Sequence, residues 1–137
     1  MYLLDTNVVS EMRKGIYADP GVKAFAAAVD GTQLFLSVLT VGEIRRGIHL
    51  IEARGDSAGG QRLQAGLDVV CADFAPRILT FDLDCAAVWA RLMMPDKSHP
   101  IDKQIAATAL LYDLTLVTRN VKDFGGLGVR IENPFQS

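Results

Sequence analysis

Cysteine is scarce in this sequence, which has only two, Cys71 and Cys85. Two cysteines cannot form a disulfide scaffold, and these two lack the paired spacing of a structural zinc site. Both fall on apolar stripes of predicted helices. We therefore expect free thiols in a protein core and a reducing compartment.

Long apolar runs are missing as well. Residues Met1 to Asp5 include no basic segment and reach a carboxylate before the core of a signal peptide could form. The longest uncharged stretch, residues 31–42, is too short to cross a bilayer. These absences predict a soluble, cytoplasmic protein that has no membrane partner.

The two signs of charge are nearly balanced, since 14 Lys and Arg residues face 16 Asp and Glu residues and give a formal net charge of −2. This balance excludes a histone-like polycation that holds nucleic acid by bulk charge, although local basic patches remain allowed. Aromatic residues make up only 7% of the chain, and no aromatic platform for stacking bases is evident.

What the chain does have is apolar surface, because 50% of its 137 residues are hydrophobic. So much apolar surface excludes a disordered chain, and the length suits one domain covering residues 1–137. Short apolar runs with little polar alternation predict buried parallel strands, and amphipathic stretches between them predict helices that cover both faces of the sheet. The predicted class is three-layer α/β/α. The expected strands lie near residues 2–4, 34–36, 78–81, 114–118 and 129–131, and loops are expected at 56–60 and 123–126.

Three carboxylates lie at the predicted strand ends. Asp5 directly follows the first strand, Glu43 lies in the first turns of the helix after the second, and Asp102 lies in the first turn of the helix that leads to the fourth. In an open parallel sheet, ligands bind at the carboxyl ends of the strands, so all three point to one edge.

Each acid also has a purely structural explanation. Asp5 could cap the helix after it, Thr40 to Glu43 match a capping box, and Asp102 could be an ordinary first-turn acid. Capping does not explain why Asp5 ends a buried strand, where like charges are costly without a counter-ion. Oxygen ligands with no histidine or thiolate nearby predict Mg²⁺ or Mn²⁺ rather than zinc.

Four segments carry a family resemblance. They are Leu3–Ser10 (LLDTNVVS), Leu39–Ile44 (LTVGEI), Asp102–Ala109 (DKQIAATA) and Leu116–Phe124 (LVTRNVKDF). In order and spacing they resemble the successive motifs of PIN-domain ribonucleases of the VapC toxin type, including FitB-like members. The resemblance covers essentially the whole chain.

The resemblance implies a PIN-like fold with a mostly parallel sheet in the order 3-2-1-4-5. It also implies an acidic Mg²⁺ (or Mn²⁺) pocket and endonucleolytic cleavage of RNA by metal-activated water. By position, Asp5, Glu43 and Asp102 match the acidic residues of the family and are expected to be both catalytic and metal-binding. A fourth family acid, where present, falls at Asn120, which we expect to take part in catalysis. Asp123, three residues on, is the expected further metal ligand, and either residue could complete the pocket through water.

Five residues near these motifs are expected to contact substrate. Thr6 and Asn7 could orient Asp5 or a metal-bound water, with helix capping as the alternative. The other three are the basic residues Arg45, Arg46 and Arg119, which with Lys103 and Lys122 could hold an RNA backbone or simply be solvated surface charges. His49 and His99 are expected on the solvent side rather than as general bases.

Two other functions remain open at this stage. Asp82 and Asp84 resemble the D-x-D motif of haloacid-dehalogenase-type phosphatases, although helix capping explains them adequately. A non-catalytic α/β interaction module is the second alternative. Trp89, Met93 and Met94 exceed what covering a small sheet requires, and the family resemblance adds a homodimer and a small cognate antitoxin as partners.

Overall fold

The computed structural model describes residues 1–136 and contains a five-stranded parallel sheet in the order β3-β2-β1-β4-β5. The strands are β1 (Tyr2–Leu4), β2 (Leu34–Ser37), β3 (Ile78–Leu79), β4 (Thr115–Val117) and β5 (Ile131–Glu132). The strand order expected from the resemblance is confirmed. β1 is the central strand, and Leu4 pairs with Val117 of β4 at its carboxyl end.

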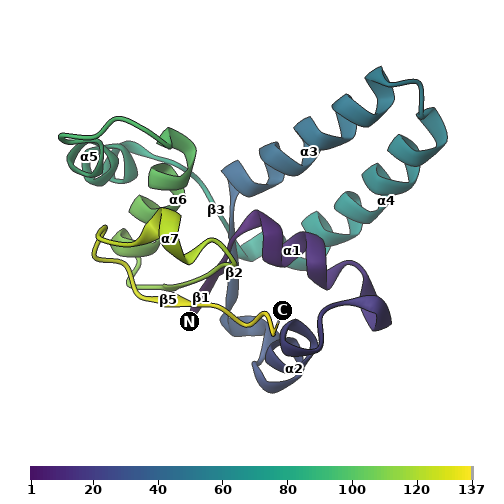
Figure 1. The fold of residues 1–137 in the computed structure, drawn as a ribbon, viewed down its shortest axis with the longest axis horizontal. Coiled ribbons are helices and arrows are strands. Elements are labelled where there is room, and N and C mark those ends of the chain that lie inside the picture. The colour runs from purple at the N-terminus through teal and green to yellow at the C-terminus, as the bar shows by residue number, and fades with distance from the viewer. Residues whose placement is uncertain (137) are drawn as a thin grey trace.

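Helices cover both faces of this sheet (Figure 1). They are α1 (Thr6–Met12), α2 (Pro20–Ala28), α3 (Val38–Ala53), α4 (Ser57–Phe74), α5 (Leu83–Leu92), α6 (Pro100–Leu111) and α7 (Val121–Phe124), with short 3₁₀ turns at Gly15–Tyr17, Gly31–Gln33 and Ala75–Arg77. The side chains of adjacent strand residues point to opposite faces. Accordingly, Leu4 packs in one core cluster with residues of α1 to α4, and Leu3 packs in another with residues of α6 and α7. The predicted three-layer α/β class is confirmed.

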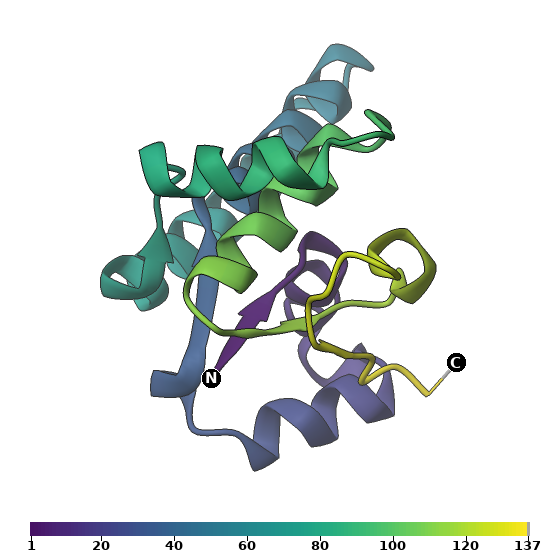
Figure 2. The ribbon, with the colours of Figure 1, turned by 90° about the vertical axis from the view of Figure 1, so that its left-hand side faces the viewer.

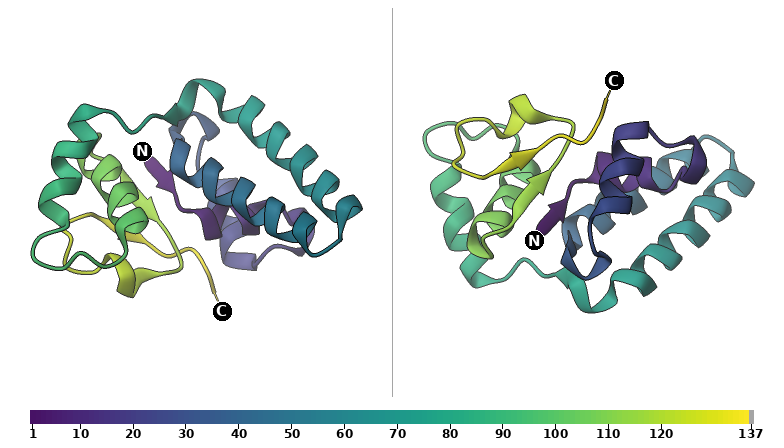
Figure 3. Two further views of the ribbon diagram at one scale, coloured as in Figure 1. Left: turned by 90° about the horizontal axis from the view of Figure 1, so that it is seen from above. Right: turned by 90° about the horizontal axis from the view of Figure 1, so that it is seen from below.

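The helices on the two faces differ in arrangement. α3 and α4 form a long antiparallel pair that extends beyond the sheet, whereas α5 packs against α6 on the other side (Figures 1 and 2). Seen from above and below, the two groups lie on opposite sides of the central strand (Figure 3).

The loop expected at residues 56–60 is mostly helix. α4 begins at Ser57, because the Asp56 side chain accepts a hydrogen bond from the Gly59 amide at 2.8 Å and caps it. A Cβ on Gly60 would collide with the Glu52 side chain of α3. The glycines that suggested a loop therefore permit a close approach of two helices.

Two further boundaries differ from expectation. α3 begins two residues before Thr40, because the Ser37 hydroxyl accepts a hydrogen bond from the Leu39 amide at 3.0 Å. The expected loop at 123–126 is partly helical, since α7 continues through Phe124, which is buried. Burial of that ring on the sheet holds the segment in a helical turn.

Both cysteines are free, with Cys85 buried and Cys71 half-buried. Across residues 1–136, no helix is long and apolar enough to span a membrane.

Candidate active site

Asp5 occupies the carboxyl end of the central strand. Its amide donates to the Val117 carbonyl at 2.9 Å, which continues the β1–β4 ladder by one bond. Its carboxylate, in a residue only 4% exposed, accepts hydrogen bonds from the Thr6 amide and the Thr118 hydroxyl, each at 2.8 Å. A third bond comes from the Asn7 amide group at 3.2 Å. Asp5 is thus the N-cap of α1, as one interpretation predicted, and also a buried charge at the sheet edge.

Burial is the main influence on the acidity of Asp5. It raises the pKa of this carboxyl above its ordinary value, and the three hydrogen bonds offset part of the increase. The negative charge of Asp123 raises the pKa of Asp5 further. The protein therefore holds a carboxylate where its ionised form is costly without a nearby cation.

Glu43 joins the site through Thr6. The Thr6 hydroxyl donates to the Glu43 carboxylate at 2.8 Å, while the Thr6 amide donates to Asp5. A capping role for Glu43 is wrong, because α3 begins at Val38 and Thr40 lies inside the helix. Thr40 is fully buried one turn before Glu43, and within residues 1–136 its hydroxyl has no hydrogen-bond partner.

Asp102 lies in the first turn of α6, and its carboxyl is affected by the charges of the other acids. Burial raises its pKa, and the charges of Asp5, then Asp123, then Glu43 raise it further. The imidazole of His99 opposes this increase, and its Nδ1 lies 3.9 Å from a carboxylate oxygen of Asp102. The charges of three other carboxylates, from different helices or helix starts, therefore act on Asp102 at this edge of the sheet.

Thr118 is a site residue that the sequence interpretation missed. It directly follows β4, as Asp5 follows β1, and it is fully buried. Besides donating to Asp5, its hydroxyl accepts from the Asn120 amide at 3.0 Å and from the Asn7 side chain at 3.4 Å. The signal that could have revealed it is the register, because residues that end neighbouring parallel strands lie side by side.

The other predicted residues fall into different environments. The Asn7 side chain accepts from the Arg119 amide at 3.1 Å and so connects the ends of β1 and β4. Asn120 is exposed and joins the site through its backbone, and its side chain makes no capping bond to α7. Of the two residues considered for the fourth ligand, Asp123 is the one whose charge acts on Asp5 and Asp102.

The basic residues are also distributed unevenly. Arg45 and Arg46 are exposed on α3, and the Arg119 guanidinium lies 4.8 Å from the centre of the Phe135 ring. Lys103, grouped with them as a surface charge near the site, is instead buried and donates to the backbone carbonyl of Asp96. Its ammonium also lies 3.8 Å from the Asp96 carboxylate, and these two contacts hold the side chain against the segment before α6.

Comparison with known proteins places this geometry in a family. The family model described as PIN domain matches residues 2–125, which contain all four carboxylates. The chain belongs to the PIN domain family. VapC ribonuclease Y4jK of Sinorhizobium fredii is 35% identical over 141 residues, which cover 99% of each chain.

Two solved structures share the PIN fold over their full length. The crystal structure of FitAcB from Neisseria gonorrhoeae superposes with a TM-score of 0.87 at 33% identity, covering 100% of both chains. A toxin-antitoxin complex from Klebsiella pneumoniae gives 0.71 at 27% identity, again covering 100% of both chains.

The donor set of this PIN domain suits a hard divalent cation. Carboxylate oxygens gather where their mutual repulsion raises the pKa of Asp102, and a bound cation would offset that repulsion. As the side chains stand in residues 1–136, however, no three His, Cys, Asp or Glu residues are grouped closely enough to hold a metal ion. Binding of one ion by three of these carboxylates would therefore require side-chain rotation, and Thr6 donates a hydrogen bond to both Asp5 and Glu43.

Proposed function

We propose that this protein is a metal-dependent endoribonuclease and the toxin of a toxin–antitoxin pair. The observation that carries the proposal is the buried Asp5 carboxylate, whose charge acts on Asp102 and which Thr6 connects to Glu43. Helix capping requires one acid and does not explain why three further acids lie around Asp5. Several carboxylates are expected where a protein binds a divalent cation.

The proposed ligands are Asp5, Glu43, Asp102 and Asp123. A bound Mg²⁺ or Mn²⁺ would lower the pKa of a water molecule and neutralise charge on the scissile phosphate. The chain itself supplies positioning, since Thr118 and Asn7 hold the Asp5 carboxylate and Thr6 holds Glu43.

RNA is the proposed substrate, and its backbone would meet a basic margin around the acids. Arg45 and Arg46 extend from the helix that carries Glu43, and Arg119 follows Thr118 directly. Asn120 adds an amide at the same margin. The name of the Sinorhizobium relative, a VapC ribonuclease, supports RNA as the substrate.

The alternative phosphatase interpretation loses its basis. The Asp82 carboxylate accepts a hydrogen bond from the Cys85 amide at 3.0 Å and caps α5, and this bond lowers its pKa. Asp82 therefore caps α5, and Asp84 is an acid in the first turn of the same helix, so both have a structural explanation. A non-catalytic interaction module does not explain why an acid is buried at this edge, where its ionised form is costly without a cation.

A small antitoxin and a second copy of the chain are the proposed protein partners. A cavity of about 770 Å³ lies between α1 and α4, and it offers a partner apolar contacts at Leu63 and Val69 beside the cations Arg13 and Arg62. The toxin-antitoxin complex from Klebsiella supports such an assembly. We further propose that a basic side chain of the antitoxin enters the acidic pocket.

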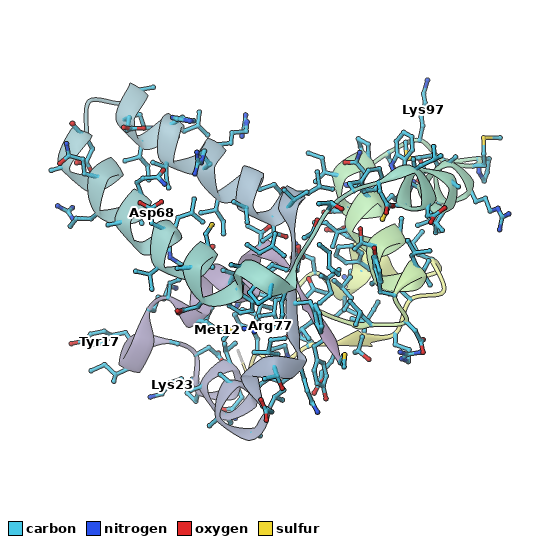
Figure 4. All side chains as sticks on the ribbon, turned by 180° about the vertical axis from the view of Figure 1, so that it is seen from behind. Met12, Tyr17, Lys23, Asp68, Arg77 and Lys97 are labelled. Carbon is cyan, nitrogen blue, oxygen red and sulfur yellow. The ribbon has the colours of Figure 1, made fainter. Side chains whose placement is uncertain are left out.

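Cleavage of RNA by purified protein tests the activity. Asp5→Asn and Asp102→Asn should each abolish Mn²⁺-dependent cleavage. Asp68→Asn on α4, whose carboxylate accepts a hydrogen bond from Gln64 at 2.9 Å, should retain it. Asp68 lies on α4, in the long helical pair (Figure 4). Wild-type turnover by either site variant would refute the metal assignment.

Binding experiments test the ligands and partners separately. Calorimetry with Mn²⁺ should show weaker binding for Asp123→Asn, and no change would remove Asp123 from the ligand set. Light scattering at micromolar concentration should give a dimer mass, and addition of the cognate antitoxin should suppress cleavage. A monomer mass would refute the proposed dimer. Cleavage unaffected by the antitoxin would refute the proposed antitoxin partner.

A further inference from the structure

We propose that a second cavity, beside the four acids, binds the nucleotide next to the scissile bond and thereby sets the sequence preference of cleavage. This inference rests on the proposed nuclease function and adds a subsite to it. The cavity measures about 320 Å³, which suits a ligand at the small end of the usual range. It lies where α7 and the segment between α5 and α6 meet, and α7 packs beside α6 (Figure 1).

The cavity borders the acidic site at Asp123 and His99. Asp123 lines it, and the charge of the same residue acts on Asp5 and on Asp102. His99 lines it as well, and its Nδ1 lies 3.9 Å from an Asp102 oxygen. A chain whose phosphate lies at the acids would therefore place its neighbouring nucleotide in this space.

The cavity wall is held in place by specific bonds. The Asp96 carboxylate accepts from the Ser98 amide at 2.9 Å and from its hydroxyl at 2.8 Å, and Lys103 donates to the Asp96 carbonyl. His99 has a left-handed backbone with φ 53° and ψ 54°, which costs free energy in a residue with a side chain. These bonds link the segment before α6 to itself and to α6, so the cavity wall has a defined hydrogen-bonded structure.

Charge on the wall is suited to a phosphate. Lys122 lines the cavity and is exposed, and its ammonium forms no ion pair within residues 1–136. Lys103, by contrast, is already committed to Asp96. An uncompensated ammonium one residue from Asp123 attracts an anionic backbone at the point where the acids would repel it.

The apolar part of the wall is suited to a base. Leu92 and Leu127 line the cavity and are half-buried, and Met94, also on the wall, is 75% exposed. A thioether is polarisable and packs well against flat aromatic rings. Together with Lys122, these side chains offer contacts to both the face of a base and its phosphate.

The experiment compares two lysines in the full-length protein. Lys122→Ala should raise the KM for a short single-stranded RNA about tenfold, with a smaller change in kcat. RNA binding without cleavage is measured in the Asp5→Asn protein. Adding Lys122→Ala to that protein should reduce the slope of log Kd against log salt concentration by about 0.7, the value for one lost phosphate contact. The control is Lys97→Ala, in the segment between α5 and α6 that borders the same cavity, because the Lys97 side chain points away from the molecule (Figure 4). A third variant, Met94→Ala, should broaden the base preference at one position beside the cut, as measured on a randomised RNA pool.

The outcomes separate this inference from the proposed function. If wild-type protein cleaves RNA but Lys122→Ala behaves like Lys97→Ala in both KM and salt slope, the cavity is not a subsite and the nuclease proposal stands. An unchanged cleavage pattern for Met94→Ala would likewise overturn the base contact. If wild-type protein cleaves no RNA, both proposals fail together.

Discussion

The hydroxyl of Thr118 offers the sharpest test of how this site is built. Thr118→Val replaces the hydroxyl by a methyl group of similar size, so the packing volume is kept and the hydrogen bonds are lost. The bond to the ionised Asp5 is worth about 1.5 to 3 kcal/mol, and loss of the acceptor for the Asn120 amide adds about 1 kcal/mol. We expect the free energy of unfolding to fall by about 3 kcal/mol, or the melting temperature by about 10 °C.

Thr118→Ser is the matched control, because it keeps the hydroxyl and loses only a methyl group, at a cost of about 1 kcal/mol. Urea unfolding of both variants in chelator at neutral pH should therefore separate them by about 2 kcal/mol. The bond lowers the pKa of Asp5, so its loss matters most when Asp5 is ionised. The difference should shrink as the pH falls through the pKa of Asp5 in the folded state.

The result that would refute this reasoning is specific. If the two variants are equally stable at neutral pH, the hydroxyl does not stabilise the carboxylate. If they differ by the same amount in acid, the loss comes from packing rather than from the charge on Asp5.

Three other predictions address the charges and the packing. Folding raises the pKa values of Asp5 and Asp102, so the stability that these acids contribute is full in acid and is lost as the pH rises through their folded pKa values. In thermal melts with chelator, Asp5→Asn should therefore gain stability relative to wild type as the pH rises. Parallel pH profiles for the two proteins would contradict this. Asn120→Asp should tighten Mn²⁺ binding by about 1 kcal/mol in calorimetric titration, and unchanged affinity would place that side chain outside the pocket. Gly21→Ala should destabilise the fold by about 1 to 3 kcal/mol, because a Cβ there collides with the backbone carbonyl of Pro134. Gly47→Ala, at an open position of α3, should stabilise it by up to about 1 kcal/mol in the same melts.

The sheet was predictable because its strands are short uninterrupted apolar runs. Residues such as Leu3 and Leu4, buried on opposite faces, leave no polar alternation that would suggest a solvent-facing sheet. The order of the strands came from the family resemblance rather than from periodicity. The start of α4 was missed because glycine is ambiguous, and only the position of Glu52 shows that Gly60 serves a helix contact.

The acids of the candidate site were predictable from the sequence, but the residues that form hydrogen bonds with them were not. Asp5, Glu43 and Asp102 each follow a recognisable signal at a strand end or a helix start. The partner of Asp5, Thr118, lies 113 residues away in the sequence, and a threonine at a strand end is unremarkable by itself. Burial of Lys103 likewise depends on a contact with Asp96 that no local pattern indicates.

That long separation has a consequence for the protein as it is synthesised. At about 5 to 20 residues per second, the ribosome adds Thr118 roughly 6 to 23 seconds after Asp5, because the two lie 113 positions apart. β1 is meanwhile an unfinished sheet edge, because β4, its neighbour on one side, has not yet been made. A nascent chain therefore carries Asp5 without the strand and hydroxyl that fix its carboxylate. Any activity of this edge would therefore begin only near the end of translation.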